Sequence, residues 1–259
     1  MDPSQLAKTT ALIRPIAIGA AAFVLAYLGV LSLAYHDTLL QWQPAPDGAA
    51  WRPTLGLVSG IILIAAGAGI AVPRLRRAAA AVGAIWLGAC AVFLHLPLVV
   101  AAHADLASLN GLAENTGWAL GLATLALTAK GRWGLALRIG FGLCCIVFGA
   151  AHFQYADFTS KMVPAWLPAR LAIAYLTGAI HFGAGVCLVL GIFPRIAALI
   201  EAAMMSSFVI LLHVPRVIGA PHDRIELTML GVAALLTLSA WLIATLPALK
   251  GRGTAPQLI

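Results

Sequence analysis

The sequence predicts an all-α integral membrane protein of about eight transmembrane helices, arranged as two tandem four-helix repeats. Three observations predict this fold class. Of the 259 residues, 62% are hydrophobic and only 10% are charged, whereas a soluble domain carries about 25% charged residues. The mean hydropathy is +0.97. Apolar runs of the length that crosses a bilayer core, roughly 20 residues, recur along the chain, and its two halves resemble each other.

The apolar runs lie at 15–34, 53–72, 78–101, 116–128, 135–151, 170–192, 196–213 and 226–246. The first run is too long for the core of a signal peptide, so we expect it to be retained as a helix. The third run contains a histidine and a proline near its end, and the seventh run ends at a histidine that a proline follows two positions later. The fourth run is the shortest, and we expect its ends to extend into Asn115 and Ala129. The other runs are long enough to span a bilayer.

Lysine and arginine gather on one side of the predicted bundle. With the N-terminus inside, the inner segments hold 11 of these residues and the outer segments hold five. The inner residues are Lys8, Arg14, Arg74, Arg76, Arg77, Lys130, Arg132, Arg138, Arg195, Lys250 and Arg252. This positive-inside bias predicts a multi-pass protein of the plasma (inner) membrane with both termini cytoplasmic. The net charge of +7 therefore reflects topology, and no nucleic-acid partner is expected.

The two halves share short motifs at a nearly constant offset. FLHLPLVV at 93–100 is echoed by LLHVPRVI at 211–218, and LAYHDTLLQW at 33–42 by GAAHFQYADF at 149–158. Glu114, expected just before the fourth helix, corresponds to Glu226, which opens the eighth. We therefore expect two repeats, 1–130 and 131–259. Because each holds four helices, the repeats keep the same orientation and a pseudo-two-fold axis runs along the membrane normal.

Histidines are concentrated toward the outer side of the predicted bundle. His152 ends the fifth helix, and His95 and His213 each begin a His-x-Pro motif near an outer helix end. Proline removes a backbone donor, so we expect each helix to kink or end there. Such a site is either a paired imidazole and free carbonyl at a cavity rim or an interfacial histidine that satisfies the freed carbonyls.

His181 lies near the middle of the sixth helix, where an ionisable side chain is costly and usually faces the bundle or a cavity. It is either functional or a neutral side chain bonded to Ser206, Ser207 or a backbone carbonyl. Glu226 is either stabilised by the helix dipole or a partner of the histidines. Glu201 is interpreted as structural, neutralised by Arg138 or Arg195. The candidate cofactor-binding residues are His95, His152, His181, His213 and Glu226.

Several motifs are absent from the sequence. It contains no P-loop, GxGxxG, CxxC, CxxCH, HExxH or GxSxG, so soluble nucleotide chemistry is not expected. All four cysteines fall inside predicted helices, which argues against a disulfide framework. The aromatic, proline-punctuated segment at 153–170 is interpreted as a lid over the outer leaflet or as an interfacial anchor.

The second half, with GAAHFQYADFTSKMVPAWLP, TGAIHFGAGVCLVLGIFPRIAAL and LLHVPRVI, resembles the DoxX-like family of small four-helix membrane proteins. The resemblance covers about residues 138–247, and the first half is similar to a diverged copy. The resemblance implies an association with membrane redox chemistry, of the kind found in quinone-linked oxidoreductase subunits. It assigns no catalytic residue.

Three functions remain open at this point. The first is a redox-associated membrane subunit whose histidines near the outer face bind a quinone, a haem or a metal and which works with a redox partner protein. Bis-imidazole haem ligation by His95 or His152 with His213 is one form of this hypothesis. The second is a small-solute transporter, and the third is a non-catalytic scaffold for a partner enzyme. The lipid bilayer is the common partner of all three, and a homo-oligomer is compatible with each.

Overall fold

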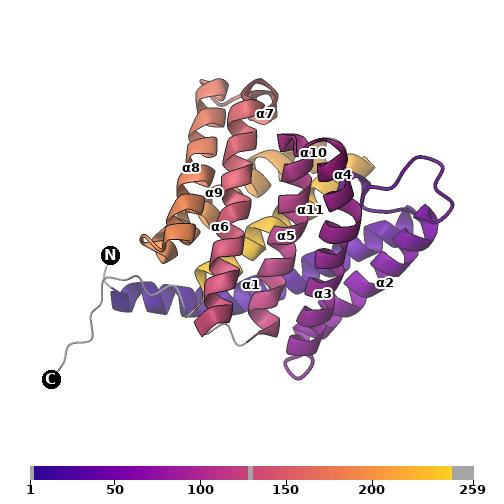
Figure 1. Ribbon diagram of the computed structural model, residues 1–259, viewed down its shortest axis with the longest axis horizontal. Coiled ribbons are helices and arrows are strands. Elements are labelled where there is room, and N and C mark those ends of the chain that lie inside the picture. The colour runs from indigo at the N-terminus through magenta and orange to yellow at the C-terminus, as the bar shows by residue number, and fades with distance from the viewer. Residues whose placement is uncertain (1–2, 128–130, 247–259) are drawn as a thin grey trace.

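The computed structural model describes residues 3–127 and 131–246, and every regular element within these ranges is helical (Figure 1). In chain order the elements are α1 (Pro3–Ala34), the short 3-10 helix η1 (Leu40–Trp42), α2 (Arg52–Ala71), α3 (Arg76–Cys90), the π-helix η2 (Ala91–His95), α4 (Leu96–Ala101), α5 (Leu106–Ala126), α6 (Gly131–Gln154), α7 (Ala156–Met162), α8 (Arg170–Leu190), α9 (Pro194–Phe208), the π-helix η3 (Val209–His213), α10 (Val214–Gly219) and α11 (Arg224–Ala244). The predicted linker around Lys130 and the basic residues Lys250 and Arg252 lie outside the described residues.

Seven helices within the described residues are long and apolar enough to cross a membrane. Two of them are continuous rods, one running from α3 through η2 to α4 and the other from α9 through η3 to α10. Of the eight predicted spans, the one not found among these seven is the fourth, which corresponds to α5. This helix is not apolar enough to count as a membrane span because it carries Asn110, Glu114 and Asn115. It still packs against α3, α6 and α11 and so belongs to the helical bundle.

Three helix boundaries differ from the prediction, because apolar runs mark the part of a helix that meets lipid and not its ends. α1 begins at Pro3 and contains Pro15, which removes only one backbone donor from a long helix. α5 begins at Leu106 and not at 116, since the Asp105 side chain caps the helix by accepting a hydrogen bond from the backbone N–H of Ser108. The seventh run continues beyond its predicted end, through α10 to Gly219.

Both His-x-Pro motifs lie at a π-bulge inside a continuous helix. The backbone N–H of Leu96 donates to the carbonyl of Ala91, five residues earlier, and the N–H of Val214 donates to that of Val209 in the same way. The wider turn accommodates a proline that follows directly and has no N–H of its own. The expected helix end at these motifs is therefore wrong, because the extra residue in the turn allows the helix to continue.

The helices pack as neighbouring pairs. α1 lies against α2 and α6 against α8, while α3 packs on α5 and α9 on α11. Two helices of the first half contact the second half. α5 contacts α6 and α11, and α1 contacts α11. In Figure 1, α6 and α8 stand side by side, and α1 and α2 lie oblique to them.

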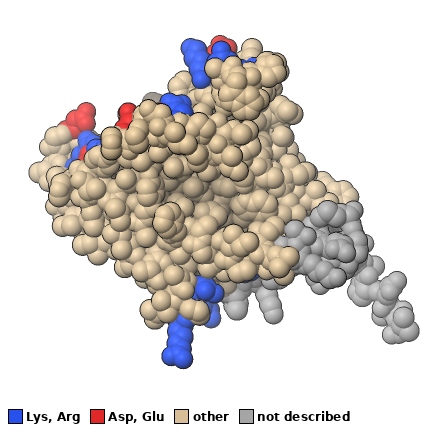
Figure 2. Space-filling view, turned by 180° about the vertical axis from the view of Figure 1, so that it is seen from behind, with Lys and Arg blue, Asp and Glu red and all other residues tan. Residues whose placement is uncertain are grey.

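The surface of the described residues is dominated by large apolar side chains. Phe23, Phe93 and Ile218 are each more than 70% exposed, as expected for side chains that face lipid. In Figure 2, Lys and Arg occur at two opposite ends of the face shown, with surface that carries none of these charged residues between them, and the Asp and Glu visible there lie at one of these ends only. This pattern fits a protein embedded in a bilayer with polar ends in water.

Candidate functional site

A cavity of about 380 Å³ lies between α5, α6, α8, α9, η3 and α11. This volume falls within the range of about 300–1,000 Å³ that is usual for sites of small molecules and cofactors. The walls are mainly apolar, and α7 with the following turn contributes Met162, Pro164 and Leu167. The segment 153–170 thus contributes to the lining of the cavity.

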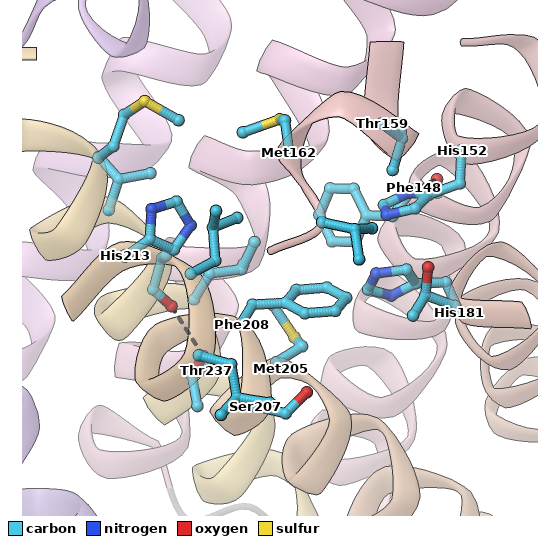
Figure 3. A pocket seen from close by; sticks show the side chains of 18 of the residues that line it. Phe148, His152, Thr159, Met162, His181, Met205, Ser207, Phe208, His213 and Thr237 are labelled. Carbon is cyan, nitrogen blue, oxygen red and sulfur yellow. Dashed lines mark hydrogen bonds between the residues drawn. The ribbon is translucent and has the colours of Figure 1, made fainter. Parts of the chain in front are cut away.

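Three of the predicted site residues line this cavity (Figure 3). His213 lies on one side, and His152 and His181 lie on the other, with Phe208 between them. The histidines come from three different rods, α6, α8 and the π-helix η3. Helix packing therefore brings together side chains that are separated by up to 61 positions in the sequence.

His181 forms a buried pair with Glu201. The ring Nδ1 lies 2.6 Å from Oε1 of Glu201, and the two side chains are only 3% and 0% exposed. The thiol of Cys145 donates to the same oxygen at 3.6 Å. The other oxygen, Oε2, is buried without a hydrogen-bond partner among the described residues. A carboxyl group in this position is a second ionisable group inside the bundle, next to the cavity wall.

This pairing corrects two interpretations of the sequence. Arg195, one proposed partner of Glu201, donates instead to the backbone carbonyl of Leu246. The hydroxyls of Ser206 and Ser207, proposed partners of His181, donate to carbonyls of their own helix. The reason is geometric: α8 and α9 form an antiparallel hairpin, and positions equally far from its turn lie at the same depth.

His152 packs against His181, with ring centroids 4.8 Å apart and the ring planes tilted by 53°. The Nδ1 atom of His152 is 2.9 Å from the carbonyl oxygen of Phe148. Since a carbonyl only accepts, Nδ1 carries the hydrogen, and Nε2 of the neutral ring is an acceptor. The approach of the two helices depends on Gly178, where an added Cβ would come within 2.8 Å of the Cβ of His152.

His213 is buried, with 7% exposure, and its Nδ1 has no hydrogen-bond partner among the described residues. Buried polar atoms in proteins are nearly always paired, so an unpaired one needs an explanation. The ring belongs to the last residue of the π-helix η3 and lines the cavity. It is therefore a polar group available to a ligand.

Trp42 and Glu114 form another part of the cavity wall. The indole N–H of Trp42 donates to Oε2 of Glu114 at 2.5 Å, and the Asn110 amide donates to Oε1 at 3.0 Å. Glu114 was expected just before the fourth helix. That placement is wrong, because α5 starts eight residues earlier and Glu114 lies well inside it.

His95 does not line the cavity but holds Trp42 in place. Its Nε2 is 3.2 Å from the Trp42 carbonyl oxygen and 2.9 Å from Nδ2 of Asn115, which donates to the same carbonyl at 3.1 Å. The structure thus separates the two His-x-Pro histidines: His213 faces the cavity, and His95 supports a residue of its wall.

Glu226 also stays outside the cavity. Its Oε1 accepts two hydrogen bonds from the guanidinium of Arg216, at 2.9 and 2.6 Å. The pair joins α10 to the start of α11. Its hydrogen bonds are therefore with a cation, although its charge also acts on His213.

No three His, Cys, Asp or Glu side chains in the part of the chain that the structure describes are placed to hold a metal ion together. The four cysteines are free. Three are buried and one is partly buried, as expected for small core residues.

Asp37 joins the segment that carries Trp42 to α11. Its carboxylate accepts hydrogen bonds from Arg52 at 2.6 and 2.9 Å and from Arg224 at 2.9 Å. Burial alone would raise the pKa of this carboxyl. The hydrogen bonds from Arg52, from the backbone N–H of Thr38 and from Arg224 outweigh burial and lower the pKa to about 2.

Sequence reasoning missed several residues of the site. Glu201 stands alone in an apolar helix, which is a signal of function in a membrane, and it lies as far after Gly191 as His181 lies before it. From this equal spacing about the turn, the contact between Glu201 and His181 could have been predicted. Trp42 and Phe208 had no comparable signal, because their contacts depend on how separate helices pack.

Residues 134–214 match the family model of DoxX. The match covers α6, α7, α8, α9 and η3, and it includes all three histidines of the cavity. No curated protein and no solved structure matches the chain. Within the second half, residues 134–214 therefore match a DoxX domain, as the resemblance of its motifs predicted, and the match ends before the predicted limit near residue 247.

Proposed function

We propose that this protein is a redox-associated membrane subunit that binds the headgroup of a quinone in the cavity lined by His152, His181 and His213. The observation that carries the proposal is an apolar cavity of about 380 Å³ with imidazoles on opposite sides. A quinone is an apolar ring with two carbonyl oxygens, so it needs an apolar slot and a few placed donors. An electron-exchanging partner protein is part of this proposal.

The hydrogen-bonding state of each ring supports a ligand of this kind. Nδ1 of His213 is buried and free within the described chain, so it can donate to a carbonyl oxygen without losing another bond. Nδ1 of His181 and Nδ1 of His152 are already occupied, by Glu201 and by the Phe148 carbonyl. Their Nε2 atoms are the ones left for the cavity.

The geometry favours a quinone over a haem held by the same rings. Two axial imidazoles must face each other across the iron. His152 and His181 lie directly against each other, with centroids 4.8 Å apart, and Phe208 lies between these two rings and His213, so neither arrangement leaves two imidazoles facing across an open space. A quinone headgroup requires no such opposition.

We also propose that residues 1–130 and 131–259 are an internal repeat related by an axis along the membrane normal. The pairing of α1 with α2 matches that of α6 with α8. A Cβ on Gly29 would meet the carbonyl oxygen of Gly60 at 2.6 Å, and a Cβ on Gly149, 120 positions later, would meet that of Gly178 at 2.8 Å. The two π-bulges lie 118 positions apart.

The proposed location is the plasma (inner) membrane, with α5 as an eighth span and both termini cytoplasmic. The excess of Lys and Arg in the inner segments supports this orientation. It places the cavity toward the outer half of the bilayer. Labelling of single cysteines in intact cells, at Asp47 for the outer side and Arg74 for the inner side, tests it. Labelling of the Arg74 position from outside would reverse the orientation.

The binding proposal is tested with detergent-purified protein titrated with a short-chain ubiquinone or with menadione. Binding is followed by quenching of tryptophan fluorescence, because Trp42 lines the cavity, and by thermal stabilisation. We expect saturable binding that His213→Leu weakens by about tenfold, the loss of roughly one hydrogen bond. His222→Ala, at an exposed histidine, is the matched control and should bind like the unaltered protein.

The same preparation is measured by absorption spectroscopy, before and after reduction with dithionite, and by metal analysis. A Soret band or a stoichiometric metal that disappears in His213→Leu would replace the quinone proposal with a haem or metal site. Failure of both quinones to bind would also refute it.

A further inference from the structure

We propose that the His181–Glu201 pair holds one exchangeable proton and thereby couples binding in the cavity to proton uptake: the carbonyl form of the ligand binds the protonated pair, and the hydroxyl form binds the deprotonated pair. This inference rests on the quinone-class ligand proposed above and assigns a function to Glu201, which does not line the cavity. Glu201 acts through His181 and is therefore a positioning residue.

The two partners must be considered together because both are buried and Nδ1 of His181 lies 2.6 Å from Oε1 of Glu201. A single uncompensated charge in such a place is costly, whereas a neutral pair is tolerated. The neutral pair contains one proton on the bond between Nδ1 of His181 and Oε1 of Glu201, wherever that proton lies along the bond. Loss of a proton leaves the pair with one net negative charge.

The proton content of the pair decides what His181 offers to the cavity. In the neutral pair, Nε2 carries a hydrogen whether the shared proton is closer to the ring or to the carboxyl. In the deprotonated pair, Nδ1–H donates to the carboxylate, and Nε2 has a free lone pair. The ring therefore changes from a donor to an acceptor when one proton leaves.

The two oxidation states of a quinone require these two states of the ring. A quinone carbonyl accepts a hydrogen bond and so selects the protonated pair. A quinol hydroxyl can donate and so pairs with the lone pair of the deprotonated ring. Replacement of bound quinol by quinone would then take up a proton from water, and the reverse exchange would release it.

Few other titratable groups of the described residues face the pair. From α6, the thiol of Cys145 donates to Oε1 of Glu201 at 3.6 Å, and the ring of His152 packs against that of His181. In α7, the charged residues Asp157 and Lys161 are exposed. In α11, the charged residues Arg224 and Glu226 lie in its first turn, and Glu226 is paired with Arg216. Next to the pair, the remaining charge-bearing candidate is therefore His152, whose Nδ1 is fixed by the Phe148 carbonyl. Elsewhere in the cavity lining, the titratable side chains are Glu114 and His213.

The test is isothermal titration calorimetry of the full-length protein with a short-chain ubiquinone and its chemically reduced quinol, in two buffers of different ionisation enthalpy. The difference in heat between buffers counts the protons exchanged on binding. We expect proton uptake with the quinone. Over the alkaline part of a range from about pH 5 to about pH 9, its Kd should rise by about tenfold per pH unit. The quinol should show no such rise.

Three variants separate the pair from other groups. Glu201→Gln keeps the shape of the side chain but cannot hold the proton, and His181→Gln removes the ring, so both should bind quinone with little dependence on pH. Asp47→Asn, at an exposed carboxylate, should keep the full dependence. The measurements on the unaltered protein remain decisive if either buried variant fails to fold.

The outcomes are distinct. Quinone binding without proton exchange across this range would overturn the inference and leave the proposed function standing. Proton uptake that persists in both Glu201→Gln and His181→Gln would assign the proton to another group and overturn it as well. Failure of quinone to bind at any pH would refute the proposed function, and this inference with it.

Discussion

Neutralising Asp37 should destabilise the fold by about 2 kcal/mol at neutral pH. The carboxylate is 17% exposed and binds Arg52 and Arg224, and its pKa is lowered from 3.8 to about 2. Each pKa unit corresponds to about 1.4 kcal/mol of preference for the charged form, so the shift stabilises the folded state by about 2 kcal/mol. Asp37→Asn is close to the protonated side chain in shape and should lose this amount.

The sign of the pH dependence follows from the direction of the shift. A carboxyl whose pKa is lower in the folded state stabilises the protein fully above its unfolded pKa, here 3.8, and loses this effect as the pH falls toward about 2. At pH 3 about half of the stabilisation remains. The difference in stability between the unaltered protein and Asp37→Asn should therefore shrink from about 2 kcal/mol at pH 7 to about 1 kcal/mol at pH 3.

The assay is unfolding in detergent micelles, followed by circular dichroism at pH 7, 5, 4 and 3 for both proteins, at a fixed detergent concentration. The control is Asp47→Asn, at a fully exposed carboxylate that also contacts Arg52, and it should change stability little. Equal stability of the unaltered protein and Asp37→Asn at pH 7, or a difference that does not shrink on acidification, would refute the assignment of the low pKa to the hydrogen bonds of Asp37 with Arg52 and Arg224.

Two further substitutions test the packing around the cavity. Gly178→Ala should cost about 1–3 kcal/mol and weaken quinone binding, because its Cβ would displace His152. Gly183→Ala in the same helix meets open space and should be neutral or stabilising by up to about 1 kcal/mol, so equal effects at the two positions would contradict the close-approach argument. His95→Ala should cost about 1–3 kcal/mol, since it removes a partner of the Trp42 carbonyl. It should also change the fluorescence quenching by quinone, and unchanged stability and quenching would show that His95 does not position Trp42.

Much of the fold could be predicted from the sequence because lipid imposes a simple rule on it. A spanning helix must be apolar over its whole length, so the runs at 53–72 and 170–192 closely match α2 and α8. The helix ends were harder, since they depend on single hydrogen bonds such as the Asp105 cap of α5. The π-bulges could not be predicted either, because proline permits a kink, a helix end or a bulge, and tertiary packing decides among them.

The candidate site was predictable only in part. Ionisable residues in apolar helices are rare enough to single out His181 and His213 from the sequence alone. Their neighbours depend on the way separate rods pack: Glu201 comes from the next helix, and Phe208 lies between His181 and His213. His95 was predicted to be a site residue on the same motif as His213, but it lies in entirely different surroundings. The motif alone therefore could not distinguish the two histidines.

The contrast between these two histidines is the strongest argument that the cavity binds a ligand. Each is the last residue of a π-bulge, precedes a proline by two positions and is more than nine-tenths buried. Nε2 of His95 lies within hydrogen-bond distance of the Trp42 carbonyl and of the Asn115 amide, whereas Nδ1 of His213 has no partner in the described chain. The local structure can therefore hold a satisfied histidine, so the free nitrogen of His213 is not forced by the π-bulge. A buried polar atom left unpaired costs about 1–3 kcal/mol, and a ligand that hydrogen-bonds to it would recover that energy on binding.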